Sequence, residues 1–405
     1  MRFLWLLLAT GLYVRAEEVT FHRDVEPILQ KHCQSCHRPG EIGPMPLMNY
    51  AQVRPWAKSI GEAVALRKMP PWFADPAVGH FANDPSLSAD ELSTVRAWVI
   101  GGAREGVKTD APAPVVRERV RPAPDLVTRM PKPIRIPANQ TLDYQYIVLS
   151  PAFSEDRWVS AVDILPGDRG VVHHAVLYVR EPGSRWLREG DPKSGTTSDI
   201  LAIYTPGAPL MECPPGMAKK IPAGSDLVLQ MHYNSRKTDA KDQTEIRVWY
   251  AKETPQSRVL TLQMSQYGLR IPPGARSYRA AVSGSVPRDA VLLSMFPHMH
   301  LRGSGFEYQI LGKAGRVDTL LRVEHYNFYW QLNYRLATPR LLPAGTQLLF
   351  TGYYDNSANN PLNPDPTEEV TWGEQSQEEM MVGFFDVAVP ASVDKPSFFI
   401  RAPGR

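Results

Sequence analysis

The sequence predicts a multidomain protein in which a small all-α domain precedes two all-β sandwich domains. Three observations predict this class: a helix-forming segment with a Cys-x-x-Cys-His motif, a proline-rich stretch after it, and a remainder of short β-rich runs separated by Pro-Gly and Asn-Ser turns. With 405 residues and a hydrophobic fraction of 43%, the chain is long enough for two or three domains.

The charge balance gives no support for two kinds of partner. Lysine and arginine exceed aspartate and glutamate by a net charge of only +3. Binding to nucleic acid or to an anionic membrane surface is typical of chains with a larger basic excess. We therefore expect no nucleic-acid partner.

Residues 1–16 have the features of a secretory signal. An arginine precedes the apolar run Phe3–Val14, and Ala16 is a small residue at the expected cleavage point. We expect a mature protein that begins near Glu17 and is exported to the periplasm. An uncleaved anchor with membrane association is the alternative, although the run is shorter than the ~20 apolar residues that span a bilayer. No later stretch predicts a transmembrane span.

Two of the cysteines form a motif, and the third is isolated in the sequence. The chain has three cysteines, of which Cys33 and Cys36 are neighbours and Cys213 has no evident partner in the sequence. A disulfide framework is therefore not expected to hold this exported protein together. We interpret Cys213 as a structural thiol rather than a nucleophile.

A first helix is predicted to lead into the cysteine motif. Asp24 can cap this helix, and Pro27 is tolerated in its first turn. Val25, Ile28 and Leu29 fall on one face of the helix, which predicts that this face packs against a core.

The motif itself predicts covalent haem. Cys33 and Cys36 have the spacing with which two thiols add to the two vinyl groups of one haem, and His37 can reach the iron as an axial ligand. A redox pair or a zinc site is the alternative. A zinc site would need further thiols or imidazoles that this segment does not provide.

The second axial ligand is expected downstream of the motif. Met69 is the best candidate, because the prolines that follow it would rigidify the loop and hold the thioether in place. Four other residues in this segment compete with it, namely Met45, Met48, His22 and His80.

A second predicted helix completes this domain. Ser88 and Glu91 form a capping box, and Gly101 follows an apolar stripe and ends the helix. The two terminal helices, the motif on the first and the Met-Pro loop between them resemble a class I cytochrome c domain over about residues 18–108. The resemblance implies a cytochrome c domain over 17–110 with one covalent haem c, held by Cys33, Cys36, His37 and Met69.

Residues 111–130 read as a linker. They are rich in proline and carry several charged residues, which predicts a semi-extended spacer rather than a core element. A domain boundary is therefore expected here.

The rest of the chain predicts two related β-domains. The β-rich runs include 158–165, 171–179, 227–233 and 347–354. The segment Ile221–Leu227 (Ile-Pro-Ala-Gly-Ser-Asp-Leu) is repeated as Leu342–Leu348 (Leu-Pro-Ala-Gly-Thr-Gln-Leu). This repeat favours two jelly-roll-like sandwiches, over 131–257 and 258–400.

Three histidines lie in the β-rich runs of the first half. His173 and His174 are adjacent, and His232 lies in a separate run. Three imidazoles suit copper or zinc. Because neighbouring residues on a strand point to opposite faces, His173 and His174 can share one ion only if the strand is bulged or strongly twisted there.

The second half contributes two histidines and a methionine. His298 and His300 alternate in a β-rich run, so both side chains are expected on one strand face. Together with Met380, which follows Glu379, they favour copper, because soft sulfur stabilises Cu(I). A single such histidine is more often a hydrogen-bonded residue than a ligand. Five histidines in three apolar runs are harder to explain as hydrogen-bonded residues alone.

These segments, in this order and approximate spacing, resemble the copper type II, ascorbate-dependent monooxygenases over about residues 125–400. This is the family of the peptidylglycine α-hydroxylating and dopamine β-monooxygenases. The resemblance implies two coppers and hydroxylation of a C–H bond with dioxygen. The electron-storing copper would be held by His173, His174 and His232. The oxygen-activating copper would be held by His298, His300 and Met380, with Met381 as the alternative sulfur.

The chain departs from the eukaryotic members of that family. They carry several disulfides and take electrons from ascorbate, whereas this chain has one spare cysteine and a predicted haem. A fused cytochrome can refill the coppers one electron at a time, supplied in turn by an external redox protein or an ascorbate-like reductant. Val382 and Phe384 stand where peptide-hydroxylating relatives place polar side chains, so a small organic substrate is expected rather than a peptide.

The sequence therefore predicts an exported haem- and copper-containing monooxygenase. A haem and copper electron-transfer protein, or a copper-binding protein without hydroxylase activity, is the alternative. An apolar cavity beside His298 and His300 would favour the enzyme. His325 belongs to no motif, and we expect a packing role for it.

Overall fold

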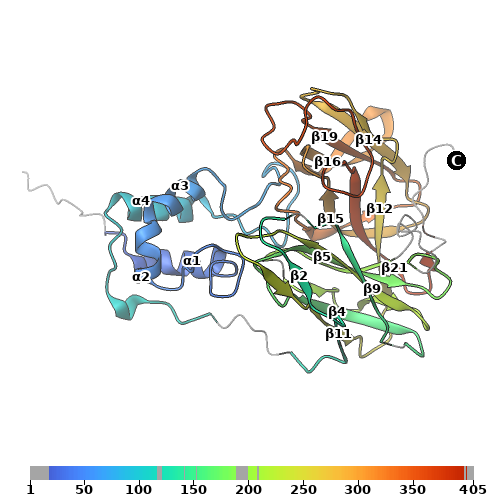
Figure 1. The fold of residues 1–405 in the computed structure, drawn as a ribbon, viewed down its shortest axis with the longest axis horizontal. Helices are drawn as coiled ribbons and strands as arrows, with labels where there is room; N and C mark the ends of the chain where they lie inside the picture. Colours follow the sequence, from blue (N-terminus) through green and yellow to red (C-terminus); the bar gives the residue numbers. More distant parts are fainter. Residues whose placement is uncertain are drawn as a thin grey trace, which may run out of the picture. The chain divides into compact units, whose positions relative to one another are not determined.

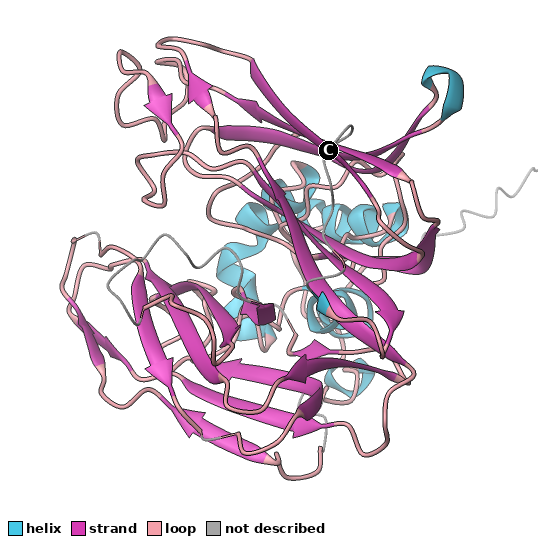
Figure 2. Cartoon of the chain, turned by 90° about the vertical axis from the view of Figure 1, so that its right-hand side faces the viewer, coloured by secondary structure: helices cyan, strands magenta, loops and turns pink. Residues whose placement is uncertain are grey.

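The protein, described here from a computed structural model, is mostly β-sheet, and the α-helices of the described residues all precede Gly101 (Figure 1; Figure 2). The structure describes residues 18–115, 121–140, 142–151, 153–187, 199–207, 209–395 and 398. The predicted signal segment 1–16 lies outside these residues. Among the helices that are described, none has the length and apolar character needed to cross a membrane.

The chain divides into two compact units. The helical unit comprises the described residues of Met1–Arg38, Gly43–Pro70 and Ser86–Arg117, and the β unit comprises those of Pro39–Ile42, Pro71–Pro85 and Glu118–Arg405. Two segments from the first hundred residues thus belong to the β unit, which the sequence did not predict.

The first helix of the helical unit begins earlier than predicted. A π-helical turn, η1 (Phe21–Val25), leads directly into α1 (Glu26–His32). The prediction that Asp24 caps the helix is therefore wrong, because Asp24 lies inside the turn, where its carboxylate accepts a hydrogen bond from the Thr20 N–H at 2.7 Å. The predicted apolar face is buried and consists of Val25, Ile28 and Leu29.

The remaining helices close a small core. They are α2 (Tyr50–Val53), η2 (Arg54–Trp56), α3 (Ala57–Ala65), α4 (Ala89–Ile100) and η3 (Lys108–Asp110). The predicted capping box is confirmed at α4, where Ser88 Oγ accepts from the Glu91 N–H at 3.1 Å and the Ser88 N–H donates to the Glu91 carboxylate at 2.7 Å. Trp98 on α4 is fully buried beside Phe21.

In the first half of the β unit, two sheets share one core. A four-stranded sheet has the order β3-β9-β5-β6, and β1, β11, β4 and β8 form the other layer. Buried side chains of both layers, such as Val162 on β4 and Leu229 on β9, lie in one cluster. The strands of this half are β1 (Leu126–Arg129), β2 (Ile134–Ile136), β3 (Gln145–Leu149), β4 (Arg157–Leu165), β5 (Val172–Arg180), β6 (Asp199–Tyr204), β7 (Met211–Glu212), β8 (Met217–Ile221), β9 (Asp226–Tyr233), β10 (Ala240–Asp242) and β11 (Glu245–Tyr250).

The second half has the same two-layer plan. The sheet β14-β19-β16-β17 packs against β12, β21, β15 and β18, and Phe350 on β19 and Phe385 on β21 meet in its core. The elements of this half are β12 (Ser257–Ser265), β13 (Arg270–Ile271), β14 (Tyr278–Ser285), β15 (Ala290–His298), β16 (Gly303–Leu311), η5 (Lys313–Gly315), β17 (Val317–Val323), β18 (Tyr334–Leu342), β19 (Gln347–Tyr354), β20 (Val370–Thr371) and β21 (Val382–Pro390).

The repeated Pro-Ala-Gly segment forms matching turns in the two halves. Before β9, the Ala223 N–H donates to Asp156 Oδ1 at 2.8 Å, and before β19 the Ala344 N–H donates to Asp289 Oδ1 at 2.8 Å. The glycine after each alanine has a positive φ, of 72° and 83°, which residues with a side chain rarely adopt. The repeat thus preserves one turn structure in both halves.

The two halves are joined through a continuous sheet. The start of β12 pairs in parallel with β8, with Ser257 opposite Met217, and this pairing links the large layers of both halves into one nine-stranded sheet. The predicted boundary at 257/258 therefore falls at the strand that the halves share.

Segment 71–85 covers the edges of the second half. It forms isolated β-bridges to β17 and β18, the last strands of the two sheets. Trp72 and Phe81 pack on the buried ring of Tyr334, with centroid distances of 4.7 and 5.6 Å. The segment is thus part of the core of the β unit.

Candidate metal centres and cavity

The first three predicted ligands lie together on paired strands. His173 and His174 are on β5, His232 is on β9, and His174 lies directly opposite His232 in the register. The register shifts between Val172 and His174, so His173 is an extra residue in the strand. The bulge that a shared site requires is therefore present. We call these three residues the triad.

The triad nitrogens are close enough to hold one ion. His173 Nδ1 lies 3.1 Å from His232 Nδ1 and 3.2 Å from His174 Nδ1. One nitrogen from each ring falls within 4.8 Å of the others, and all three side chains are buried. Three converging imidazoles in an apolar setting are a donor set suited to copper or zinc.

Burial keeps the triad uncharged. Desolvation lowers the pKa of His173 to about 4 and the pKa of His232 to about 3, and repulsion between the rings acts in the same direction. The pKa of His174 lies well below its usual 6.5 for the same reasons. A neutral imidazole keeps a lone pair available, so these rings need lose no proton to bind a metal at neutral pH.

The second pair lies at the end of β15. His298 is the last residue of the strand and His300 lies just past it, so the expected shared strand face is only partly realised. Their ring centroids are nevertheless 5.2 Å apart. We call these two residues the pair.

Hydrogen bonds fix the orientation of the pair. His298 Nδ1 lies 2.7 Å from Gln331 Oε1, and His300 Nδ1 lies 3.2 Å from the Glu378 carbonyl. Because both acceptors require an N–H, Nε2 of each ring is the nitrogen left for a metal. His300 Nε2 is buried and forms no hydrogen bond of ordinary geometry with the described residues.

A buried carboxylate ties the pair to Met380. Glu379 is fully buried, and it accepts backbone N–H bonds from His300 at 2.9 Å, Arg302 at 2.6 Å and Met380 at 3.1 Å. Burial raises the pKa of Glu379 to about 7 although these bonds oppose the rise. The sequence marked Glu379 only as the neighbour of Met380, because the bonds form between segments that are distant along the chain.

The two candidate sulfurs lie in different surroundings. Met380 lines a cavity together with His298, whereas Met381 is fully buried in the core of the second half. The Met380 carbonyl accepts a hydrogen bond from Tyr354 Oη at 2.9 Å, which fixes its backbone. The arrangement favours Met380 over Met381 as a ligand beside the pair.

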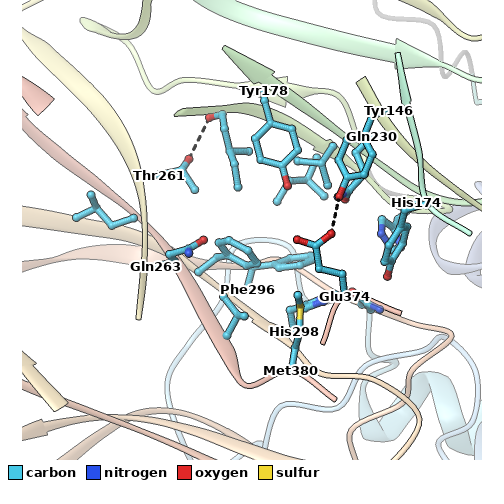
Figure 3. A pocket seen from close by; sticks show the side chains of 18 of the residues that line it. Tyr146, His174, Tyr178, Gln230, Thr261, Gln263, Phe296, His298, Glu374 and Met380 are labelled. Atoms are coloured by element: carbon cyan, nitrogen blue, oxygen red, sulfur yellow. Dashed lines mark hydrogen bonds between the residues drawn. The ribbon is translucent and has the colours of Figure 1, made fainter. Parts of the chain in front are cut away.

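A cavity of about 290 Å³ lies beside both centres (Figure 3). Side chains from both halves of the β unit line it, including His174 of the triad and His298 of the pair. Its walls are mainly aromatic and aliphatic and include Phe296, Phe384 and Val382.

A polar chain reaches the same cavity. Gln230 Nε2 donates to Tyr146 Oη at 2.7 Å, and Tyr146 Oη donates to Glu374 Oε2 at 3.4 Å (Figure 3). Burial, with the nearby Glu374 charge, raises the pKa of Tyr146 to about 12, so the phenol keeps its proton. Sequence reasoning missed these three residues, because no local pattern distinguishes them from ordinary strand and loop residues.

In the helical unit, the Cys-x-x-Cys-His motif forms a compact turn after α1. The N–H groups of Cys36 and His37 both donate to the Cys33 carbonyl, at 3.1 and 2.9 Å. His37 Nδ1 lies 3.1 Å from the Met45 carbonyl, which leaves Nε2 as the nitrogen that can face an iron. Gly43 packs so closely that a Cβ there would lie 2.6 Å from the Cys36 carbonyl oxygen.

The structure shows the surroundings of each candidate for the predicted second axial ligand. His22 is paired with Glu26 at 2.7 Å, Met48 is exposed, and His80 lies in the segment that belongs to the β unit. Met45 packs on the same core as Cys33, and Met69 is partly buried after α3. Met69 therefore stays a prediction, with Met45 as its competitor.

Two residues outside the motifs can now be placed. Cys213 is partly buried, and burial raises the pKa of its thiol to about 11, which agrees with a structural role. His325 is exposed, so the packing role expected for it is wrong.

Comparison with known proteins adds little. The sequence matches no family model. Among solved structures, the chain is similar to the major capsid protein P2 of bacteriophage PM2, at 10% identity over 66% of this chain and 99% of that one, with a TM-score of 0.29. It is also similar to a peptide-N(4)-(N-acetyl-β-D-glucosaminyl)asparagine amidase, at 9% identity over 65% of this chain and 97% of that one, with a TM-score of 0.27. At these scores the likeness carries no conclusion about fold or function.

Proposed function

We propose that the protein is an exported haem- and copper-containing monooxygenase that hydroxylates a C–H bond of a small organic substrate with dioxygen. The observation that carries the proposal is the apolar cavity lined by His298, Met380 and His174. A pure electron carrier needs no such space beside its metal, whereas an enzyme must admit a substrate.

The donor sets suit copper at both centres. The triad offers three neutral imidazoles, and the pair offers two oriented imidazoles beside a thioether, which favours Cu(I). Copper held there would supply one-electron redox chemistry and a position for dioxygen. The protein would contribute burial, fixed imidazole orientation and the Glu379 clamp that holds the backbone of His300 and Met380.

The cavity limits the substrate. Its volume of about 290 Å³ lies just below the ~300–1,000 Å³ typical of ligand pockets. Val382 and Phe384 make one wall apolar, while Tyr146 and Glu374 provide a polar end. A small, partly apolar molecule fits these walls better than a peptide.

The helical unit would carry one covalent haem c as a cytochrome c domain. Cys33 and Cys36 would supply the thioether links and His37 Nε2 an axial ligand, with Met69 or Met45 as the second. Hydroxylation with dioxygen consumes two electrons per turnover, so an external redox protein or an ascorbate-like reductant must supply them.

The proposal can be tested on protein matured in a bacterial periplasm. We expect one haem and two coppers per chain, and we expect the anaerobically reduced protein to consume dioxygen and to transfer one labelled oxygen atom from ¹⁸O₂ to an organic substrate. His298→Ala should remove this reactivity and leave the haem content unchanged. Two coppers and a haem without oxygen transfer to any substrate would instead identify an electron-transfer protein.

A further inference from the structure

One loop touches both candidate centres. Residues 326–331, which we call the bridging loop, lie between β17 and β18 in the second half of the β unit. Its side chains contact the pair on one side and, through Phe328, the triad of the first half on the other.

The bridging loop holds the backbone and one ring of the pair. Tyr326 Oη accepts the Met299 N–H at 3.0 Å and donates to the Met299 carbonyl at 2.8 Å, so it clamps the residue between the two histidines. Gln331 is 3% exposed, and its Oε1 accepts the hydrogen bond from His298 Nδ1. Movement of this loop would therefore alter the ligands of the pair.

The same loop covers the triad. The ring of Phe328, which is 5% exposed, stacks on His173 with centroids 5.2 Å apart and planes inclined by 30°. It also meets the edge of His232 at 6.1 Å and of His300 at 6.4 Å. The two centres also meet directly, because the ring centroids of His174 and His298 lie 6.4 Å apart. Apart from these histidines, Phe328 is the one described aromatic side chain whose ring contacts include members of both the triad and the pair.

A continuous series of contacts connects the centres. It runs from His298 Nδ1 to Gln331 Oε1 at 2.7 Å, from Gln331 Nε2 to the Phe328 carbonyl at 3.4 Å, and from the Phe328 ring to His173. We propose that the bridging loop couples copper binding at the two centres, so that occupation of the pair tightens binding at the triad through Phe328. This inference rests on the proposed function, because it assumes copper at both centres.

The coupling would arise because a metal at one centre reduces the conformational freedom of side chains at the other. A metal on His298 Nε2 would draw electron density from the ring and make its Nδ1–H a stronger donor, which strengthens the bond to Gln331 and holds the Phe328 ring against His173. A triad ring already held in its binding orientation loses less freedom when a metal arrives. By linkage, the triad must tighten the pair by the same factor, and such factors are typically about 5–150.

The test is a set of Cu(I) titrations on the full-length holoprotein matured with haem, in competition with a chromogenic Cu(I) chelator. His300→Ala isolates the triad and leaves the His298–Gln331 bond in place, and His232→Ala isolates the pair. The coupling factor is the overall association constant of the parent for two Cu(I) ions, divided by the product of the two association constants measured for the single sites. We expect a coupling factor of at least about 5 in the parent. When Phe328→Leu is added to the parent and to each of the two single-site variants, the factor should be close to 1.

Phe385→Leu is the matched control, because Phe385 is a similarly buried aromatic in the same half whose ring packs on Phe350. It should leave the coupling factor unchanged. Should Phe328→Leu fail to fold, Gln331→Ala must lower the factor in its place. Two bound coppers with a parent factor near 1, or a factor that survives both substitutions, would overturn this inference alone. A parent that binds fewer than two coppers would overturn the proposed function as well.

Discussion

His174 of the triad and His298 of the pair meet edge to face, with ring centroids 6.4 Å apart and planes inclined by 83°. The two residues come from β5 and β15, in different halves of the β unit. The two rings also interact electrostatically, because a positive charge on His298 would lower the pKa of His174 further. The cavity is lined by both rings, so the two centres and the proposed substrate space meet at one place.

The first prediction concerns Met380. Loss of a residue that merely orients a ligand typically costs about 10–100-fold in metal affinity or activity. Met380→Ala removes a proposed ligand, so it should lower oxygen consumption by about 100-fold or more. The haem absorption spectrum should not change. Stopped-flow measurement of oxygen uptake by the reduced protein checks this.

Met381→Leu is the matched control for that substitution. Met381 is buried in the core, and leucine has a similar volume, so the free energy of unfolding should fall by less than about 1.5 kcal/mol and oxygen consumption should persist. The opposite pattern, with Met381→Leu inactive and Met380→Ala active, would move the ligand role to Met381.

Local patterns were sufficient to predict several elements. If the adjacent His173 and His174 share one ion, the strand must be bulged or strongly twisted there, and the register of β5 contains a bulge. The Pro-Ala-Gly repeat and the capping box at Ser88 could likewise be recognised in the sequence, since each depends on residues close together in the chain.

Long-range packing explains what the sequence did not reveal. Phe328 and Gln331 lie in a loop without a motif, and they acquire a role only because β17 and β18 place that loop between the triad and the pair. Segment 71–85 looked like part of the helical unit, but Trp72 finds its partner Tyr334 more than two hundred residues later in the chain. Neither relationship leaves a periodic signal in the sequence.

The second prediction concerns the anchoring of segment 71–85. Trp72→Ala should lower the free energy of unfolding of the β unit by about 3 kcal/mol, because the indole packs on Tyr334 and Phe81. This is the lower end of the range for a buried tryptophan, since Trp72 is only partly buried. Chemical denaturation followed by far-ultraviolet circular dichroism measures the loss. Leu341→Ala is the control, since Leu341 lies on β18 of the same unit, is 59% exposed, and should change stability by no more than about 0.5 kcal/mol. Equal losses in the two variants would contradict the anchoring role.

The third prediction is a pH dependence of the helical unit. Burial alone would raise the pKa of Glu91, but hydrogen bonds from the Ser88 backbone, His32 and Lys31 lower it from 4.5 to about 2. A carboxyl group whose pKa is lower in the folded than in the unfolded protein stabilises the fold at pH values above its unfolded-state pKa. This stabilisation is lost as the pH falls from about 4.5 towards 2. The loss should be about 1 kcal/mol after allowance for solvent screening.

Glu91→Gln tests that dependence, because the amide cannot titrate. The melting temperature of the helical unit, followed through the haem absorbance, should fall less steeply between pH 4.5 and 2 in this variant than in the parent. Parallel pH profiles would remove Glu91 from the acid response. Asp90→Asn is the control, since Asp90 lies in the same helical turn and is not part of the capping box.

The last prediction is that the haem is the electron donor of the β unit. Both proposed cofactors belong to one chain, so electron transfer between them needs no encounter between proteins, whereas dioxygen should react slowly with a haem whose iron has two axial ligands. Reduced haem should therefore be reoxidised by dioxygen faster in the copper-loaded protein than in the copper-free form, as followed by the haem absorbance after rapid mixing. His298→Ala, loaded with copper at the triad only, should behave like the copper-free form, because it lacks the centre proposed to react with dioxygen. Equal reoxidation rates with and without copper would show that the haem does not feed the copper centres, and the search for the donor would then turn to an external reductant.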